Sequence, residues 1–226
     1  MCRCGVTHTV ALMQDQKRNV DGNSRLTALL GATVLPAFFA AWLVGKVGGP
    51  PLATAHIVIA LILAAPLAAK LTTVTYRMVS YYRGVGAYRR RGRPANRLRL
   101  LGATLGSSML VVFASGLVLM FGPASAYVTA KSVHSVAAWL ALVAIGLHLA
   151  AHGAQTRRLV AAEMRPAAGR PRGFGHRLAT VGTTVLCGAI LAVALFQQAS
   201  HVHIPRRGTS RAAVVAAHAG HHHHRA

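Results

Sequence analysis

The chain has 226 residues, of which 54% are hydrophobic, and it carries 25 Lys and Arg against three acidic residues, a formal net charge of +22. This composition is too apolar for an ordinary soluble domain, and its basic runs separate segments that cannot face water, which excludes the usual pattern of a nucleic-acid-binding protein. Long apolar runs that alternate with basic runs are typical of a multi-pass membrane protein.

Five segments are long and apolar enough to cross a bilayer, whose core requires about 20 residues of helix. We predict these spans at residues 27–48, 53–79, 100–122, 132–154 and 178–198. The expected fold is therefore an all-α integral membrane bundle of about five helices. Its predicted regions are a disordered extension over residues 1–25, a membrane domain over 26–200 and a disordered His-rich tail over 201–226.

The basic residues predict the orientation of these spans. Eight arginines lie in the run that joins the second span to the third, and six lie between the fourth and the fifth. The other two connections hold one lysine each, Lys46 and Lys131. By the positive-inside rule both Arg-rich loops face the cytoplasm of the cell membrane, which places the N-terminus inside and the C-terminus outside. Four arginines in the C-terminal tail weigh mildly against this assignment.

Histidines inside the second and fourth spans are functional candidates, because ionisable groups are costly in a membrane. His56 lies about one turn into the second span and His134 about one turn into the fourth. Both spans run from outside to inside, so we expect the two imidazoles at one depth near the outer side. Two imidazoles at one level on two helices can hold a haem iron between them. The alternative for each is an interfacial histidine that bonds to water or headgroups.

The fourth span also carries His148 and His152. His148 follows His134 by fourteen residues, about 21 Å along a helix axis, and all three histidines share one face. Many cytochromes b hold two stacked haems with this spacing, but fourteen residues after His56 comes Lys70, not a histidine. A second haem thus lacks its expected ligand. His148 and His152 could still bind a haem with His176 or another ligand outside the spans, relay protons, contact a quinone or hydrogen-bond within the bundle.

Two lysines are candidates for binding acidic groups of such a cofactor. Lys131 precedes His134 by three residues, so we expect it about one turn above the iron, where it could pair with a haem propionate. Lys70 could snorkel toward the cytoplasmic boundary, or it could pair with a propionate or an anionic substrate.

Small residues mark the third span as packing scaffold. Gly102 and Gly106 have the small-xxx-small spacing that lets membrane helices approach closely. The functional alternative is that Gly116 or Gly146 makes room for a flat macrocycle.

The C-terminal tail is rich in histidine, and such tracts can bind divalent metals weakly. The candidate ligands there are His218, His221, His222, His223 and His224. A disordered tail with no metal role is the alternative. His201 and His203, just beyond the fifth span, are further candidates for an outer haem ligand.

Parts of the chain resemble a known family. The pieces "TAHIVIALILAAPLAAKLTTVTYRMVSYYRGVGAYRRRGRP" and "VHSVAAWLALVAIGLHLAAH" resemble multi-pass membrane proteins of actinobacteria and related bacteria. That family is similar to cytochrome b and cytochrome b561-like subunits, which serve membrane redox complexes such as molybdopterin-dependent oxidoreductases. The resemblance implies His56 and His134 as haem b ligands, with His148 and His152 less secure. It implies no substrate.

Two classes of function follow from the sequence. The first is a b-type cytochrome that passes electrons between a quinone pool or a partner subunit and an acceptor. The second is a membrane protein that binds or transports divalent metals through its histidines. A dication in the spans needs carboxylates, and the acidic residues Asp15, Asp21 and Glu163 all lie outside them, which favours the cytochrome. Without an acid–base pair or nucleophile, an electron-transfer subunit is favoured over an enzyme acting by itself.

Overall fold

Helices make up nearly all of the computed structural model, which describes residues 3–90 and 96–197. The helices are α1 (Arg3–Val47), α2 (Pro50–Tyr82), α3 (Gly86–Arg89), α4 (Asn96–Phe121), α5 (Tyr127–Glu163) and α6 (Phe174–Ala194). Single 3₁₀ turns, Ala124–Ala126 and Ala167–Gly169, precede α5 and α6. No strand occurs in these two ranges. The proposed metal ligands of the tail, His218 and His221 to His224, lie outside them, as do His201 and His203.

Five of these helices are long and apolar enough to cross a membrane, which confirms the predicted all-α architecture. The apolar segments are Val20–Val47, Pro51–Tyr82, Asn96–Phe121, Ala124–Glu163 and Phe174–Ala194. Each segment corresponds to one predicted span, and most of the observed ends lie within a few residues of the predicted ends. The chain is therefore a multi-pass helical membrane protein.

The N-terminal segment differs from the expectation of a disordered extension, because α1 already begins at Arg3. Its later part contacts the rest of the fold: Val20 is buried against Ala87 and Tyr88 of α3. Asn23 of the same part donates a side-chain hydrogen bond to the Thr73 carbonyl of α2. These contacts are between residues far apart in the sequence, which local composition does not reveal.

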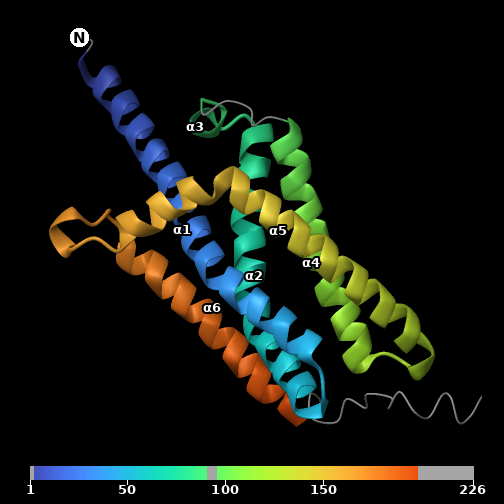
Figure 1. Ribbon diagram of the computed structural model, residues 1–226. Coiled ribbons are helices and arrows are strands. Elements are labelled where there is room, and N and C mark those ends of the chain that lie inside the picture. The colour runs from blue at the N-terminus through green and yellow to red at the C-terminus, as the bar shows by residue number, and fades with distance from the viewer. Residues whose placement is uncertain (1–2, 91–95, 198–226) are drawn as a thin grey trace, which may run out of the picture.

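The bundle is built from two antiparallel hairpins and one further helix. In Figure 1, α1 and α2 form one hairpin, α4 and α5 form the other, and α6 lies along the first. Gly48 and Gly49 make the turn between α1 and α2 with φ angles of 79° and 94°, which favour glycine, and Pro50 and Pro51 then start α2. A Cβ at Gly188 of α6 would collide with the Ile62 carbonyl, so this glycine sets how closely α6 packs on α2.

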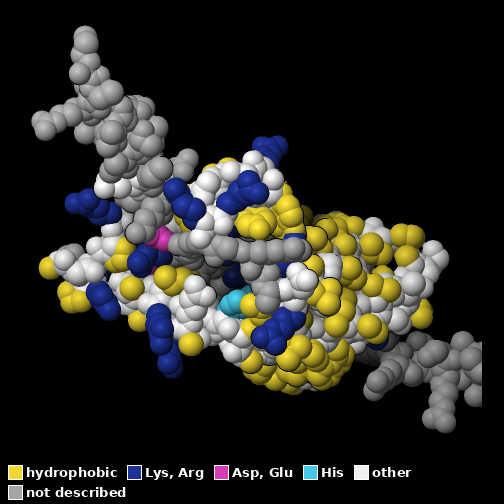
Figure 2. All heavy atoms as spheres, turned by 90° about the horizontal axis from the view of Figure 1, so that it is seen from above, with side chains coloured by type: hydrophobic (Ala, Val, Ile, Leu, Met, Phe, Trp, Pro, Cys, Tyr) yellow, Lys and Arg dark blue, Asp and Glu magenta, His cyan; other side chains and the backbone are white. Residues whose placement is uncertain are grey.

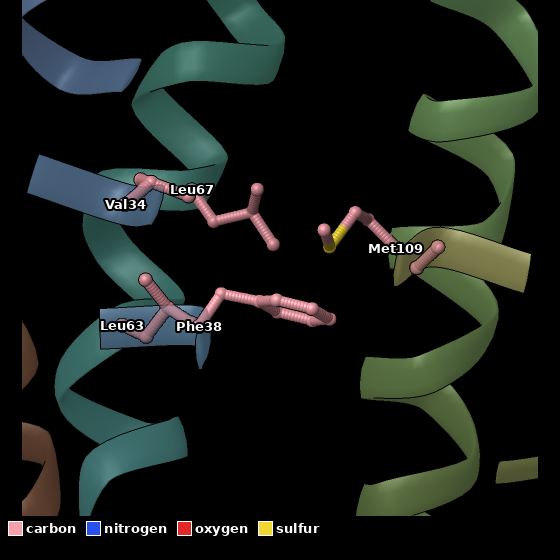
Figure 3. Packing of buried hydrophobic residues seen from close by; sticks show 6 residues of the cluster. Val34, Phe38, Leu63, Leu67 and Met109 are labelled. Carbon is pink, nitrogen blue, oxygen red and sulfur yellow. The ribbon is translucent and has the colours of Figure 1, made fainter. Parts of the chain in front are cut away.

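The two hairpins meet in one apolar cluster. Figure 3 shows Phe38 and Leu67 of the first hairpin reaching toward Met109 of α4. Val34, Leu63 and Ala141 complete the cluster, so α1, α2, α4 and α5 all contribute to it. Since lipid tails are as apolar as these side chains, the cluster holds the hairpins together by close packing and not by exclusion of water.

A buried carboxylate ties together three helices. Glu163, at the end of α5, has a fully buried side chain, and both of its oxygens accept hydrogen bonds from Arg177 of α6 at 2.9 Å. Arg25 of α1 donates a third hydrogen bond to it at 3.3 Å. Such a charge is stable in the interior only because its partners neutralise it.

Basic side chains gather at the end of the bundle that holds Glu163. Figure 2, seen from above the view of Figure 1, shows dark blue Lys and Arg side chains spread over this end, with hydrophobic side chains below them. The exposed arginines of this end come from the loops and helix ends, and they include Arg83, Arg89, Arg97, Arg157, Arg158, Arg165 and Arg170.

Replacing Glu163 tests how much this carboxylate contributes to the stability of the fold. We expect Glu163→Gln to destabilise the protein by about 3 kcal/mol, because two arginines would keep their charge in a partly buried place without a counter-ion. The thermal unfolding midpoint in detergent measures this loss. Arg165→Gln, at an exposed position, is the control and should leave the midpoint nearly unchanged. Equal midpoints for the two variants would contradict the role given to Glu163.

Candidate functional site

His56 of α2 and His134 of α5 face one another between the two hairpins. Their ring centroids lie 6.0 Å apart, and the ring planes are 82° from parallel. Both rings are half-buried. The structure thus brings together the two histidines that the sequence predicts at one level.

The δ nitrogen of each imidazole bonds to a backbone carbonyl of the preceding helix. His56 Nδ1 lies 2.7 Å from the Ala41 oxygen of α1, and His134 Nδ1 lies 2.9 Å from the Val112 oxygen of α4. A carbonyl can only accept, so each Nδ1 carries the proton and donates it. Each Nε2 of a neutral ring is then left with its lone pair. This is the tautomer in which a histidine binds a metal, with the other nitrogen held by the protein.

Two glycines make these hydrogen bonds possible. Gly45 follows Ala41 by four residues, and a Cβ built on it would lie 2.9 Å from His56 Nδ1. Gly116 follows Val112 by four residues, and its Cβ would lie 3.4 Å from His134 Cε1. In a helix the residue at i+4 donates to the carbonyl of residue i, so its side chain lies beside that oxygen. A glycine there leaves the carbonyl's second lone pair open to an imidazole from the next helix.

Ser115 adds a contact to the His134 side. Its hydroxyl oxygen lies 3.2 Å from His134 Nδ1, and it also lies 2.6 Å from the Val111 carbonyl, to which it donates. The Nδ1 proton is thereby shared between two acceptors on α4. The ring of His134 is held in orientation more firmly than a single bond would hold it.

The geometry of the pair fits an iron between the rings. Metal–imidazole bonds of about 2 Å on either side of one ion would place the two ring centroids about 6 Å apart. The observed separation is 6.0 Å. Neutral imidazoles without a nearby carboxylate also suit a haem iron, whose porphyrin already supplies negative charge. On separation and tautomer, His56 and His134 fit the axial ligands of a haem.

Aromatic side chains lie near this level on α1 and α5. Trp42, next to Ala41, packs edge-on against Trp139, with ring centroids 5.4 Å apart. The Trp42 indole nitrogen is buried and has no hydrogen-bond partner among the described residues. A buried N–H without an acceptor is unfavourable, so this donor is suited to an acidic or carbonyl group brought by a ligand.

Two lysines lie at the end of the bundle that holds the paired imidazoles. Lys131 is exposed, and its ammonium lies 5.8 Å from the ring centroid of Tyr127 on the same helix. Lys46, which the sequence analysis used only for topology, lies over the Trp139 ring at 4.7 Å. It directly follows Gly45, so this second cation belongs to the same end of the bundle as the paired imidazoles.

The remaining predicted residues, Lys70, His148 and His152, lie further along their helices, toward the Arg-rich end of the bundle. Lys70 of α2 donates to the Thr27 carbonyl of α1 at 3.2 Å, and His148 and His152 of α5 pair with each other at a centroid distance of 4.9 Å. His148 and Lys70 are close enough to interact electrostatically. Nothing in this arrangement connects these groups to His56 and His134 directly.

The glycines named from the sequence fall into two groups: those where an added Cβ would contact another side chain, and those where it would enter open space. Gly116 meets the His134 ring, and Gly106 meets a methyl group of Leu71 on α2 at 3.8 Å, in agreement with helix packing. Gly102 and Gly146 have nothing within 4 Å of a built Cβ. The sequence analysis missed Gly45, although a glycine four residues beyond the carbonyl recurs on both hairpins and could have signalled it.

No family model matches the chain, and no curated protein or solved structure matches it. In the described part of the chain, no three His, Cys, Asp or Glu side chains gather as they would around a metal ion. The interpretation of this site therefore depends on the geometry of the His56–His134 pair.

Filling the space of Gly45 tests the carbonyl anchor. We expect Gly45→Ala to displace the His56 ring and to destabilise the protein by roughly 1–3 kcal/mol, as overpacking generally does. Gly146→Ala is the matched control, because its methyl group enters open space. It should leave stability unchanged or raise it by up to about 1 kcal/mol through helix propensity. Thermal unfolding in detergent compares the two, and a Gly45→Ala protein as stable as Gly146→Ala would disprove the anchor.

Proposed function

We propose that the protein is a membrane-bound b-type cytochrome that holds one haem between His56 of α2 and His134 of α5. The observation that carries the proposal is the pair of facing imidazoles at 6.0 Å, each with its Nδ1 proton donated to a carbonyl of the neighbouring helix. Two rings fixed in this tautomer each keep an Nε2 lone pair that can bind a metal.

In this function the haem, when bound, supplies one-electron transfer. His56 and His134 would hold it, and the hydrogen bonds from Nδ1 to the carbonyls of Ala41 and Val112 would raise the basicity of the ligating nitrogens. The helices around the pair keep the site apolar, and burial is one of the factors that set a haem potential. Trp42 and Lys46 are the candidates to bind the acidic edge of the cofactor, in place of Lys131.

The cytochrome would act as an electron carrier and not as an enzyme by itself. Its electrons would come from, or pass to, a quinone or a partner redox subunit, such as the molybdopterin-dependent oxidoreductases implied by the resemblance described above. The Arg-rich end offers a surface for such a subunit. His56 and His134, which would hold the haem, lie about two turns from the opposite ends of α2 and α5.

Divalent-metal binding or transport remains the second candidate. It rests on the histidine tail and on His148 and His152. A dication that crosses hydrocarbon needs carboxylates beside its ligands. Glu163, which is fully buried, already accepts hydrogen bonds from Arg25 and Arg177. This charge balance favours the cytochrome.

We also propose that the Arg-rich end faces the cytoplasm. Arginines of both long loops gather there with the ends of α2 and α5, whereas the opposite end carries Lys46 and Lys131. The positive-inside rule then places the proposed haem toward the outer face of the cell membrane.

A visible spectrum tests the haem directly. The reduced-minus-oxidised spectrum of the detergent-purified protein should contain a b-type α-band, and a pyridine haemochrome assay should give one haem per chain. His56→Ala and His134→Ala should each remove most of the band, because one imidazole alone holds the iron weakly. His176→Ala, at an exposed position near the start of α6, is the control and should retain it.

A second pair of variants separates ligation from folding. His134→Met should keep a haem and raise its midpoint potential, because a methionine ligand favours the reduced state. A chain that binds no haem when made in haem-supplied cells, or a band that survives both alanine variants, would reject the proposal.

Single cysteines can report the orientation. A cysteine at Arg89 should be labelled by a membrane-impermeant maleimide only after the cells are opened, and a cysteine at Ser125 should be labelled in intact cells. The native cysteines Cys2, Cys4 and Cys187 are replaced by serine in both proteins to remove background. The reverse labelling pattern would invert the proposed topology.

A further inference from the structure

A second polar site lies one level away from the paired imidazoles. Lys70 and His148 follow His56 and His134 by fourteen residues each, so both lie about 21 Å further along their helices. The two are close enough to interact electrostatically. His152 extends the site by one turn, with its ring centroid 4.9 Å from that of His148.

Helix α1 holds Lys70 in the way that it holds His56. The ammonium donates to the Thr27 carbonyl at 3.2 Å, and Gly31 follows Thr27 by four residues. A Cβ on Gly31 would lie 2.6 Å from the Lys70 nitrogen. The half-buried ammonium is therefore fixed between α1 and α2.

The charge of this site is uncompensated. Lys70 interacts with the positive charge of Arg77 on the same helix, and no ion pair joins Lys70 to a carboxylate within the described residues. Glu163 is bonded to Arg25 and Arg177. A cation away from water needs a counter-charge, so the site calls for an anionic ligand and is unsuited to a second cation such as a metal ion.

The depth of the site limits the source of that anion. The proposed haem at His56 would be about 21 Å away along α2, which is farther than a porphyrin propionate extends from its iron. From Pro51, Lys70 lies about 30 Å along α2, which is the thickness of a hydrocarbon core. Lys70 is thus placed near the boundary where the phosphates of lipid headgroups lie, on the Arg-rich side.

We propose that Lys70, His148 and His152 form a binding site for a phosphate group, and that its occupant is the headgroup of an acidic phospholipid. The ammonium supplies the charge, and the two imidazoles supply N–H donors to the phosphate oxygens. Basic pockets between membrane helices bind acidic lipids in this way. Free phosphate has the same chemistry, and the experiment below separates the two sources. The site does not depend on the proposed haem function.

Lipid-dependent stabilisation measures this binding. The thermal unfolding midpoint of the purified full chain is followed in a zwitterionic detergent while phosphatidylglycerol, phosphatidylcholine or inorganic phosphate is added at constant ionic strength. For the wild type we expect a rise with phosphatidylglycerol and none with phosphatidylcholine. A rise with inorganic phosphate as large as that with phosphatidylglycerol would support the phosphate site and identify a soluble anion as its occupant.

The variants localise the effect. Lys70→Gln should raise the half-saturating phosphatidylglycerol concentration at least tenfold, whereas Lys131→Gln, an exposed lysine at the opposite end, should leave it unchanged. Lys70→Arg keeps the charge and should retain most of the response. If Lys70→Gln fails to fold, His148→Gln and His152→Gln give the same test, each with an expected severalfold weakening.

Three results would overturn the proposal. They are the same lipid response in Lys70→Gln as in Lys131→Gln, no response of the wild type to either phosphate-bearing probe, and a second haem that disappears in His148→Ala. Haem content of the Lys70→Gln protein is measured in parallel. It should equal that of the wild type, so failure of this site and failure of the haem proposal are distinguished.

Discussion

A hydrogen bond from a side chain to a carbonyl of a neighbouring helix fixes three of the polar groups on which the proposed sites of this bundle depend. The carbonyl already accepts from its own helix, and a glycine four residues further on leaves its second lone pair accessible. The three cases are His56 on Ala41 beside Gly45, His134 on Val112 beside Gly116, and Lys70 on Thr27 beside Gly31. In a membrane these donors have no water to bond with, so the neighbouring backbone is their available acceptor. These glycines thus allow the helices of each hairpin to approach closely, and they also allow the functional groups to be oriented by backbone carbonyls.

The two ends of the molecule differ in charge because the arginines of both long loops lie at one of them. Glu163 joins α1, α5 and α6 through Arg25 and Arg177, and the remaining arginines of that end stay exposed. This end can interact with acidic lipids or an acidic partner. The other end has fewer charges and carries the facing imidazoles. A redox group at one level and an anion site at the other would divide the two functions along the helix axes.

Much of the candidate site could be predicted from the sequence. The depth of His56 and His134 follows from their distance to the span ends, and facing imidazoles follow from two parallel spans in one bundle. The anchoring carbonyls could not be predicted, because they depend on which helix packs beside which. Lys131 illustrates the same limit: it is one turn from His134 in sequence, yet its ammonium lies over Tyr127, while Lys46 from another helix reaches Trp139.

The sequence by itself determined the class of protein, the five apolar spans and the depth of His56 and His134 within them, because hydropathy and length are local properties. Only the tertiary structure decided that α1 already begins at Arg3 and that Glu163 is buried. It also decided that glycines leave space for the side chains of His56, His134 and Lys70 to reach backbone carbonyls. Each of these depends on contacts between residues far apart in the chain. Such contacts are set by how whole helices pack, and a pattern along one helix does not contain them.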